Sequence, residues 1–267
     1  MKRTSPFLIP LIVAVIITAI LGVILIALEI GENGETQVTE APETDAPETE
    51  APRTPPDPTF KADVHEYEEY MNATDKKYLI LVNKQNTIDG SFEPEELVPV
   101  ADAKKSIELS KTAEMALEAM FCEMRAEGFN DVFVTSAYRS YSYQTSLFNT
   151  YINDEMSRGL SYEEAKEKVL TYSAYPGTSE HHTGLCVDLM TTSMTELDES
   201  FADYPVYEWL LENAWKFGFI LRYPEDKTEI TSYSFEPWHY RFVGREHAYA
   251  ICSEGLCLEE YVGKSDR

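Results

Sequence analysis

The chain is 267 residues long, has a formal net charge of −25 and is 43% hydrophobic. This length allows one or two folded domains, and the hydrophobic content is enough for a sizeable core. Such a strong negative charge argues against nucleic acid as a partner and against docking on anionic lipid by charge alone. We expect no nucleic-acid partner, and no segment indicates a protein partner.

Residues 7–28 form an apolar run that follows Lys2 and Arg3. A run of this length can cross a bilayer as one helix. A cleavable signal peptide would have a shorter apolar stretch followed by small residues, and residues 28–31 (LEIG) offer no such site. We therefore expect residues 1–29 to be a cytoplasmic stub with an uncleaved anchor. The cations before the run predict a single-pass cell-membrane protein whose folded domain is extracytoplasmic.

Residues 30–59 contain near-repeats of five residues rich in Pro, Glu and Thr, such as APETD at 41–45 and APETE at 46–50. A segment with so little to bury is typical of a disordered linker. Proline and like charge favour an extended chain of about 3 Å per residue. The linker can therefore hold a domain at residues 60–267 tens of ångströms from the membrane.

The region from residue 60 mixes helix and strand signals. Strands are predicted at 78–82, at 131–136 as a central strand, at 219–222 and at 238–243. Helices are predicted from 103 to 125 before Gly128, between 147 and 156 before Gly159, after a capping box at 161–164, and from 205 to 217. The order shows no regular βαβ repeat, so we expect an α+β fold.

Two short stretches hold candidate metal ligands. His181 and Asp188 are seven residues apart, and residues 184–189 between and after them are typical of a short buried strand entered through a glycine turn. A buried carboxylate is costly unless it is paired or bound to a metal. His239 would complete a set of two imidazoles and one carboxylate, which suits catalytic zinc with one position left open.

Glu236 lies three residues before His239, across Pro237. Proline biases the residue before it toward an extended backbone, so this carboxylate can approach the site without being a ligand. Such a group can take a proton from an attacking water and pass it to a leaving amine. The alternative is a structural role, in which Glu236 forms a surface ion pair with Arg222 or Arg241.

These residues resemble a known family. The patterns SxHxxGxxxD at 179–188 and ExxH at 236–239 are similar to those of the VanY-type zinc D-alanyl-D-alanine carboxypeptidases and their L,D-carboxypeptidase relatives. A third block, SAYRS at 136–140 with Gln144, is similar to the SxYRS…Q element of that family. The resemblance runs from about Tyr78 to Tyr261.

The resemblance implies a small antiparallel sheet with surrounding helices, as in the Hedgehog-like D,D-peptidase fold. It also implies one zinc ion held by His181, Asp188 and His239, with Glu236 as the general base. Peptidoglycan stem peptides are the implied substrate, and their C-terminal D-alanine is removed. Three further residues are expected at the substrate: Arg139, Gln144 and Ser179. A guanidinium such as Arg139 can bind a terminal carboxylate or stabilise a developing oxyanion.

Several alternatives stay open at this point. His182 is a competing ligand beside His181, although the resemblance assigns His181. Cys186 is expected to be a small core residue, and a thiolate ligand there would put the predicted donor set in doubt. The pairing of the four cysteines is not specified by the sequence. L,D-carboxypeptidase action and a non-catalytic zinc-containing wall-binding domain remain alternative functions, and an intact Glu236 argues against the second.

Overall fold

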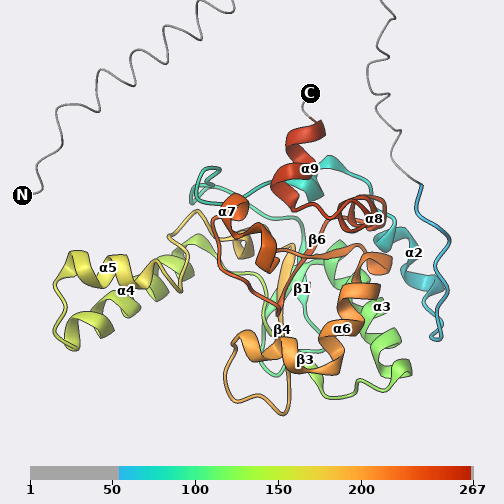
Figure 1. Ribbon diagram of the computed structural model, residues 1–267, viewed down its shortest axis with the longest axis horizontal. Coiled ribbons are helices and arrows are strands. Elements are labelled where there is room, and N and C mark those ends of the chain that lie inside the picture. Colours follow the sequence, from blue (N-terminus) through green and yellow to red (C-terminus); the bar gives the residue numbers. More distant parts are fainter. Residues whose placement is uncertain (1–53, 266–267) are drawn as a thin grey trace, which may run out of the picture. The chain divides into compact units, whose positions relative to one another are not determined.

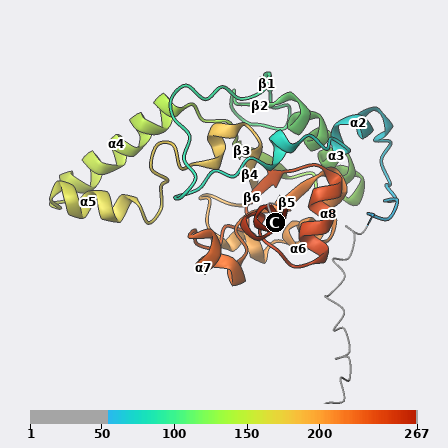
Figure 2. The same cartoon turned by 90° about the horizontal axis from the view of Figure 1, so that it is seen from above.

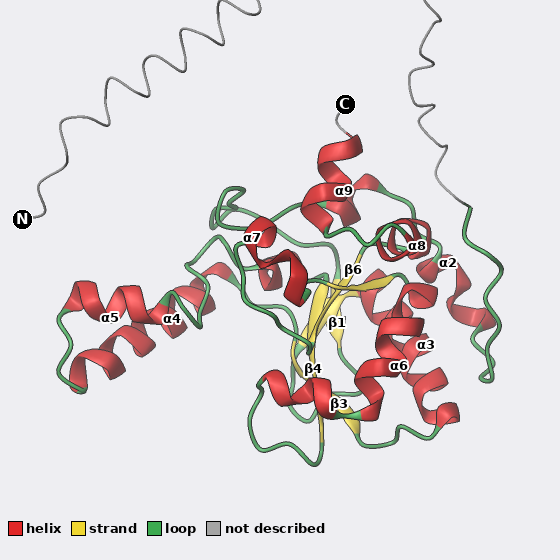
Figure 3. Ribbon diagram, viewed as in Figure 1, coloured by secondary structure: helices red, strands yellow, loops and turns green. Residues whose placement is uncertain are grey.

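The computed structural model describes residues 54–265. Its main sheet has four antiparallel strands in the order β3-β4-β6-β5. Figure 3 shows strands in yellow with helices in red around them. These strands are β3 (Val132–Ser136), β4 (Cys186–Thr191), β5 (Phe219–Leu221) and β6 (His239–Phe242). A separate pair is formed by β1 (Leu97–Pro99) and β2 (Glu108–Ser110).

The helices surround this sheet. They are α2 (Glu68–Met71), α3 (Lys111–Glu127), α4 (Tyr141–Ser157), α5 (Tyr162–Val169), α6 (Pro205–Asn213), α7 (Thr228–Thr231), α8 (Arg245–Ser253) and α9 (Leu258–Ser265). Short 3-10 turns occupy 65–67, 76–79, 180–183, 199–203, 214–217 and 225–227. The α+β class and the small antiparallel sheet expected from the sequence are both confirmed.

The main core lies between α3 and the sheet. Leu117, Met120 and Phe121 of α3 belong to one buried cluster with Val187 and Leu189 of β4. All six residues of β4 are buried, because the strand has a partner on either side and is covered on both faces. Burying each large apolar side chain in this cluster contributes about 1.5–3 kcal/mol. The strand that carries Asp188 is thus buried along its whole length.

The helices α4 and α5 form an arm that projects from the sheet on the side opposite α3 (Figures 1 and 2). The arm has a small core of its own, made of Phe148, Ile152, Ala165 and Val169. The predicted capping box is confirmed, since Ser161 and Glu164 each hold a backbone amide of the other. The two helices of the arm therefore pack mainly against each other.

The strand predicted at 78–82 is wrong. Residues 76–79 form a 3-10 turn, which begins where the Asp75 side chain accepts from the Lys77 amide at 2.9 Å. The carbonyls of Tyr78 and Ile80 each accept from Arg241 Nη2 at 2.8 Å. A buried guanidinium thus replaces the strand partner that an extended segment would need.

Other boundaries differ less. The helix predicted from 103 begins at Lys111, because β2 occupies 108–110, and it ends at Gly128 as expected, with φ 104°. The strand predicted as central, β3, is at an edge of the sheet and is bridged only by Ala103 on its outer side. The helix predicted to 217 ends at Asn213 and continues as a 3-10 turn. All four cysteines are free thiols.

The expected membrane anchor and most of the expected linker lie outside the described residues. Within residues 54–265, no helix combines the length and the apolar character that crossing a membrane requires.

Candidate metal centre

Strand pairing brings Asp188 and His239 together. In the antiparallel ladder between β4 and β6, these two residues are direct partners. Side chains of such partners leave the same face of a sheet about 5 Å apart. His239 Nδ1 accordingly lies 3.0 Å from Asp188 Oδ1. Both residues are buried, at 2% and 6% exposure.

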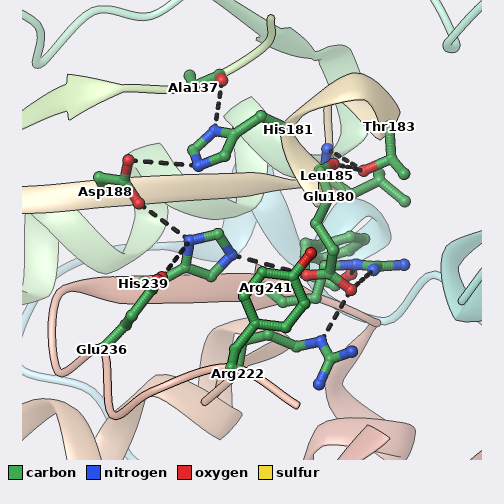
Figure 4. A network of polar contacts seen from close by, with 12 residues as sticks. Ala137, Glu180, His181, Thr183, Leu185, Asp188, Arg222, Glu236, His239 and Arg241 are labelled. Atoms are coloured by element: carbon green, nitrogen blue, oxygen red, sulfur yellow. Dashed lines mark hydrogen bonds and ion pairs between the residues drawn. The ribbon is translucent and has the colours of Figure 1, made fainter. Parts of the chain in front are cut away.

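His181 reaches the same carboxylate from the turn before β4. Its Nε2 lies 3.3 Å from Asp188 Oδ2, and its ring is nearly perpendicular to that of His239, with centroids 5.0 Å apart. The turn ends at Gly184, whose φ is +66°. A Cβ at this position would lie 3.1 Å from Leu97 Cδ2, so glycine suits both the backbone and the space. This turn explains how His181 can lie beside the strand that follows it (Figure 4).

The hydrogen-bonding pattern of His181 requires a positive charge. Its Nδ1 lies 2.6 Å from the Ala137 carbonyl, which can only accept, and its Nε2 faces the Asp188 carboxylate. A neutral imidazole has one N–H, so it cannot donate to both groups. Burial and Arg139 lower the pKa of His181, but Asp188 outweighs them and raises it to about 9. A proton or a metal cation therefore belongs between His181 and Asp188.

His239 also has a hydrogen-bond acceptor near each of its ring nitrogens. Its Nδ1 faces Asp188, and its Nε2 lies 3.6 Å from Glu180 Oε2, so acceptors lie on both sides of the ring. Burial lowers the pKa of His239, and neighbouring Cys186 and Asp188 outweigh it, so the pKa lies well above its usual value. Burial would raise the pKa of Asp188, but the two histidines hold it well below the ordinary range. The donor set of two imidazoles and one carboxylate fits a divalent zinc ion.

Cys186 offers a second donor set with the same histidines. Its sulfur and a nitrogen of each imidazole lie within 4.8 Å of one another. Burial would raise the pKa of this thiol, but His181 and His239 lower it to about 7. Cys186 is 0% exposed and does not line the cleft that opens onto the site, whereas Asp188 does. Because a substrate must reach the metal, the set with Asp188 is the better fit to a catalytic site.

His182 has hydrogen-bond partners that a neutral imidazole can satisfy, unlike His181. Its Nδ1 lies 2.7 Å from the Arg139 carbonyl, and its Nε2 accepts from the Gly177 amide at 3.1 Å. One neutral tautomer satisfies both contacts. The ring also stacks on Tyr141, with centroids 5.8 Å apart. His182 is therefore a buried structural residue that holds the loop in place.

Glu236 is at the edge of the site, on the segment between β5 and β6. Its Oε2 lies 3.6 Å from His239 Nδ1, and its side chain is 27% exposed. The backbone holds it in place, since the Glu236 amide donates to the Tyr223 carbonyl and the His239 amide donates to the Glu236 carbonyl, both at 3.1 Å. Burial raises the pKa of Glu236, and nearby His239 partly opposes this rise. The ion pair with Arg222 or Arg241 that was considered for Glu236 does not form, because both arginines bind Glu180.

The site opens into a cleft of about 910 Å³. Arg139 and Ser179 line it, as predicted for residues that contact a substrate, together with Asp188, Glu236 and both proposed imidazole ligands. Tyr151 of α4, residues 170–175 after α5 and residues 232–234 also line the cleft. The cleft is large enough for an extended peptide end.

Gln144 does not lie where a substrate ligand was expected. It is 0% exposed and is absent from the cleft lining. Its Oε1 accepts from Arg139 Nη1 at 3.0 Å, and its Nε2 donates to the Ala174 carbonyl at 2.7 Å. Gln144 therefore orients Arg139 from behind, and its predicted contact with substrate becomes an indirect one.

Sequence reasoning missed a buried carboxylate beside the site. Glu180 Oε1 accepts from Arg222 Nε at 2.8 Å and from Arg241 Nη1 at 2.6 Å, with all three side chains 0% exposed. Burial would raise the pKa of Glu180, but the two guanidiniums outweigh it and hold the pKa well below its usual value. The available signal was two arginines in segments predicted as strands, 219–222 and 238–243, because buried cations need a buried counter-charge.

Comparison with known proteins places this geometry in a family. The family model described as VanY, D-alanyl-D-alanine carboxypeptidase, matches residues 106–245. A curated relative, the putative carboxypeptidase YodJ of Bacillus subtilis, is 41% identical over 194 residues. The match covers 70% of this chain and 67% of the relative.

Solved structures agree. The vancomycin resistance D,D-pentapeptidase VanY in complex with Zn(II) is 39% identical with a TM-score of 0.58, over 70% of this chain and 99% of that one. The LdcB LD-carboxypeptidase is 38% identical with a TM-score of 0.62, over 70% and 86% of the two chains. Because the family model matches more than half of the chain and a close structural neighbour holds zinc, this chain belongs to the VanY D-alanyl-D-alanine carboxypeptidase family and is a zinc metallopeptidase.

Proposed function

We propose that this chain removes the C-terminal D-alanine from peptidoglycan stem peptides, with His181, Asp188 and His239 as the ligands of one zinc ion. The observation that carries the proposal is the convergence of these three donors, with Glu236 beside them, at a cleft that also contains Arg139. The family match and the zinc-containing VanY neighbour support the same activity.

Glu236 is proposed to carry the proton through the reaction. When bound, zinc polarises the scissile carbonyl and makes water a better nucleophile. Glu236 accepts a proton as the water oxygen attacks the carbonyl carbon. It then gives that proton to the leaving amine as the C–N bond breaks, which releases free D-alanine and a peptide with a new carboxylate. Its place 3.6 Å from His239 Nδ1, and its partial exposure to the cleft, support this role.

Arg139 is proposed to bind the terminal carboxylate of the substrate. Its guanidinium lines the cleft and lies close enough to His181 to lower the pKa of that residue. Gln144 fixes one of its amino groups, which leaves the rest of the planar fork for a bidentate contact. Ser179, which lines the same cleft, is proposed to supply a further hydroxyl contact.

L,D-carboxypeptidase action is the second candidate, because the LdcB LD-carboxypeptidase has the same fold and nearly the same identity to this chain as VanY. The two activities use the same chemistry on different stem peptides. The family match favours the D,D-activity.

We also propose that the chain is anchored by residues 7–28 and presents its catalytic domain outside the cytoplasm. The apolar run after Lys2 and Arg3 supports this, as does the extracytoplasmic location of peptidoglycan.

The first prediction separates the adjacent histidines. Replacing His181 with alanine should weaken zinc binding by more than the roughly 10–100-fold typical of an outer-shell partner. Replacing His182 with alanine should leave the zinc dissociation constant nearly unchanged but lower the melting temperature, because its two hydrogen bonds are structural. Chelator competition gives the first quantity and circular dichroism the second. Equal zinc affinity in the two variants would contradict the assignment.

The second prediction concerns Glu236. The change Glu236→Gln should leave zinc bound at one equivalent and lower kcat by about 10²–10⁴, because the amide cannot accept a proton. Glu229→Gln, an exposed change on α7, is the matched control and should keep full activity. Turnover is followed as release of D-alanine from a pentapeptide stem. Near-normal activity of Glu236→Gln would show that the base is misassigned.

The third prediction concerns stem length. The purified protein should shorten a pentapeptide ending in D-Ala-D-Ala by one residue and leave the corresponding tetrapeptide intact over the same time. Mass spectrometry of both reactions gives the answer directly. Cleavage of the tetrapeptide alone would assign the L,D-activity, and cleavage of neither peptide would remove the proposed function.

The fourth prediction concerns the anchor. The full chain should sediment with membranes and be digested by protease added to intact wall-free cells, whereas a chain beginning at residue 54 should stay in the soluble fraction. Recovery of the full chain in the soluble fraction would contradict anchoring, and protection from external protease would contradict the proposed orientation.

A further inference from the structure

Two buried polar atoms face each other beside the proposed metal centre, on residues that both belong to the lining of the cleft. His239 Nε2 and Glu180 Oε2 have no hydrogen-bond partner among the described residues and lie 3.6 Å apart (Figure 4). His239 is 2% exposed and Glu180 is 1% exposed. Buried polar atoms are nearly always paired, so a facing pair of this kind requires an explanation.

Glu180 is held so that only one of its oxygens is engaged. Both arginines bind Oε1, and Oε2 is left directed at the ring of His239. The arginines are themselves fixed: Arg241 donates to two backbone carbonyls, and Arg222 binds Glu259 of α9 at 2.8 and 2.6 Å. The two guanidiniums and two carboxylates balance in charge. Glu180 is thus a rigid carboxylate with one free oxygen.

The sheet explains the alignment. Arg241 follows His239 by two residues on β6, so both side chains leave the same face. Arg222 comes directly after β5, which pairs with β6. The acceptor aimed at His239 is therefore set by the same ladder that places Nδ1 of the ring against Asp188.

Resting on the proposed ligand role of His239, we propose that Glu180 is a positioning residue for this ring: its Oε2 accepts the Nε2–H of His239, so the lone pair of Nδ1 is presented to zinc. Histidines that bind metals commonly donate their other N–H to a carboxylate, which fixes the tautomer and orientation of the ring and raises its basicity. Glu180 contacts neither the cation nor the substrate in this role.

The test compares two charge-neutralising changes at either end of the same chain of ion pairs. Glu180→Gln should weaken zinc binding by roughly 10–100-fold, as removal of an outer-shell carboxylate does elsewhere. Glu259→Gln removes the same charge from Arg222 without touching His239, and it should stay within about threefold of the parent affinity, below the effect of an outer-shell change. The zinc dissociation constant of both full-length variants is measured by chelator competition. The melting temperatures of the metal-free proteins are measured as a control for folding.

The outcomes separate the explanations. Parent-like zinc affinity in Glu180→Gln, or an equal loss in both variants, would overturn the positioning role. If Glu180→Gln does not fold, ¹⁵N-histidine NMR of the zinc-loaded parent decides: the proposal requires His239 to carry its proton on Nε2, and a proton on Nδ1 would overturn it. Failure of the proposed function is distinguishable, because His181→Ala would then bind zinc as tightly as the parent.

Discussion

The pairing of Asp188 with His239 across β4 and β6 is the constraint on which the site depends. A shift of one residue in this ladder would turn Asp188 to the other face of the sheet and remove the meeting point of the three donors. The register is secured because β4 is buried along its whole length and Val187 and Leu189 belong to the main core. Core packing thus fixes the position of a charged group that the core would otherwise exclude.

The charges around the site are arranged in two layers. In the inner layer, the Asp188 carboxylate lies between the imidazoles of His181 and His239. Each ring then has hydrogen-bond acceptors at both of its nitrogens, so a proton or a metal cation must lie between the ring and the carboxylate. In the outer layer, Glu180 is held by Arg222 and Arg241. Arg222 also binds Glu259 on α9, and Arg241 also donates to the carbonyls of residues 78 and 80. Buried ion pairs of this kind seldom add stability over an apolar core, although losing one partner is costly. Their value here is in fixing orientation.

The sequence was sufficient for the fold class and for the family with its zinc, and the structure brings the predicted metal ligands together. Local patterns indicated the glycine turns, the strand after Gly184 and the candidate residues His181, Asp188, Glu236 and His239. The resemblance to a family then predicted that these four residues lie together in one site. The turn at 76–79 was missed because its backbone is satisfied by Arg241, more than 160 residues away. Glu180 was overlooked for the same reason, since its arginine partners are 42 and 61 residues away. The burial of Gln144 was missed because its amide donates to the Ala174 carbonyl, 30 residues away.

The central claim is that zinc is held by two imidazoles and one carboxylate while the Cys186 thiol stays uncoordinated. X-ray absorption at the zinc edge of the zinc-loaded full chain tests it most directly. The account predicts a shell of only nitrogen and oxygen neighbours at about 2.0–2.2 Å. A sulfur neighbour at about 2.3 Å would contradict it and assign the alternative set with Cys186.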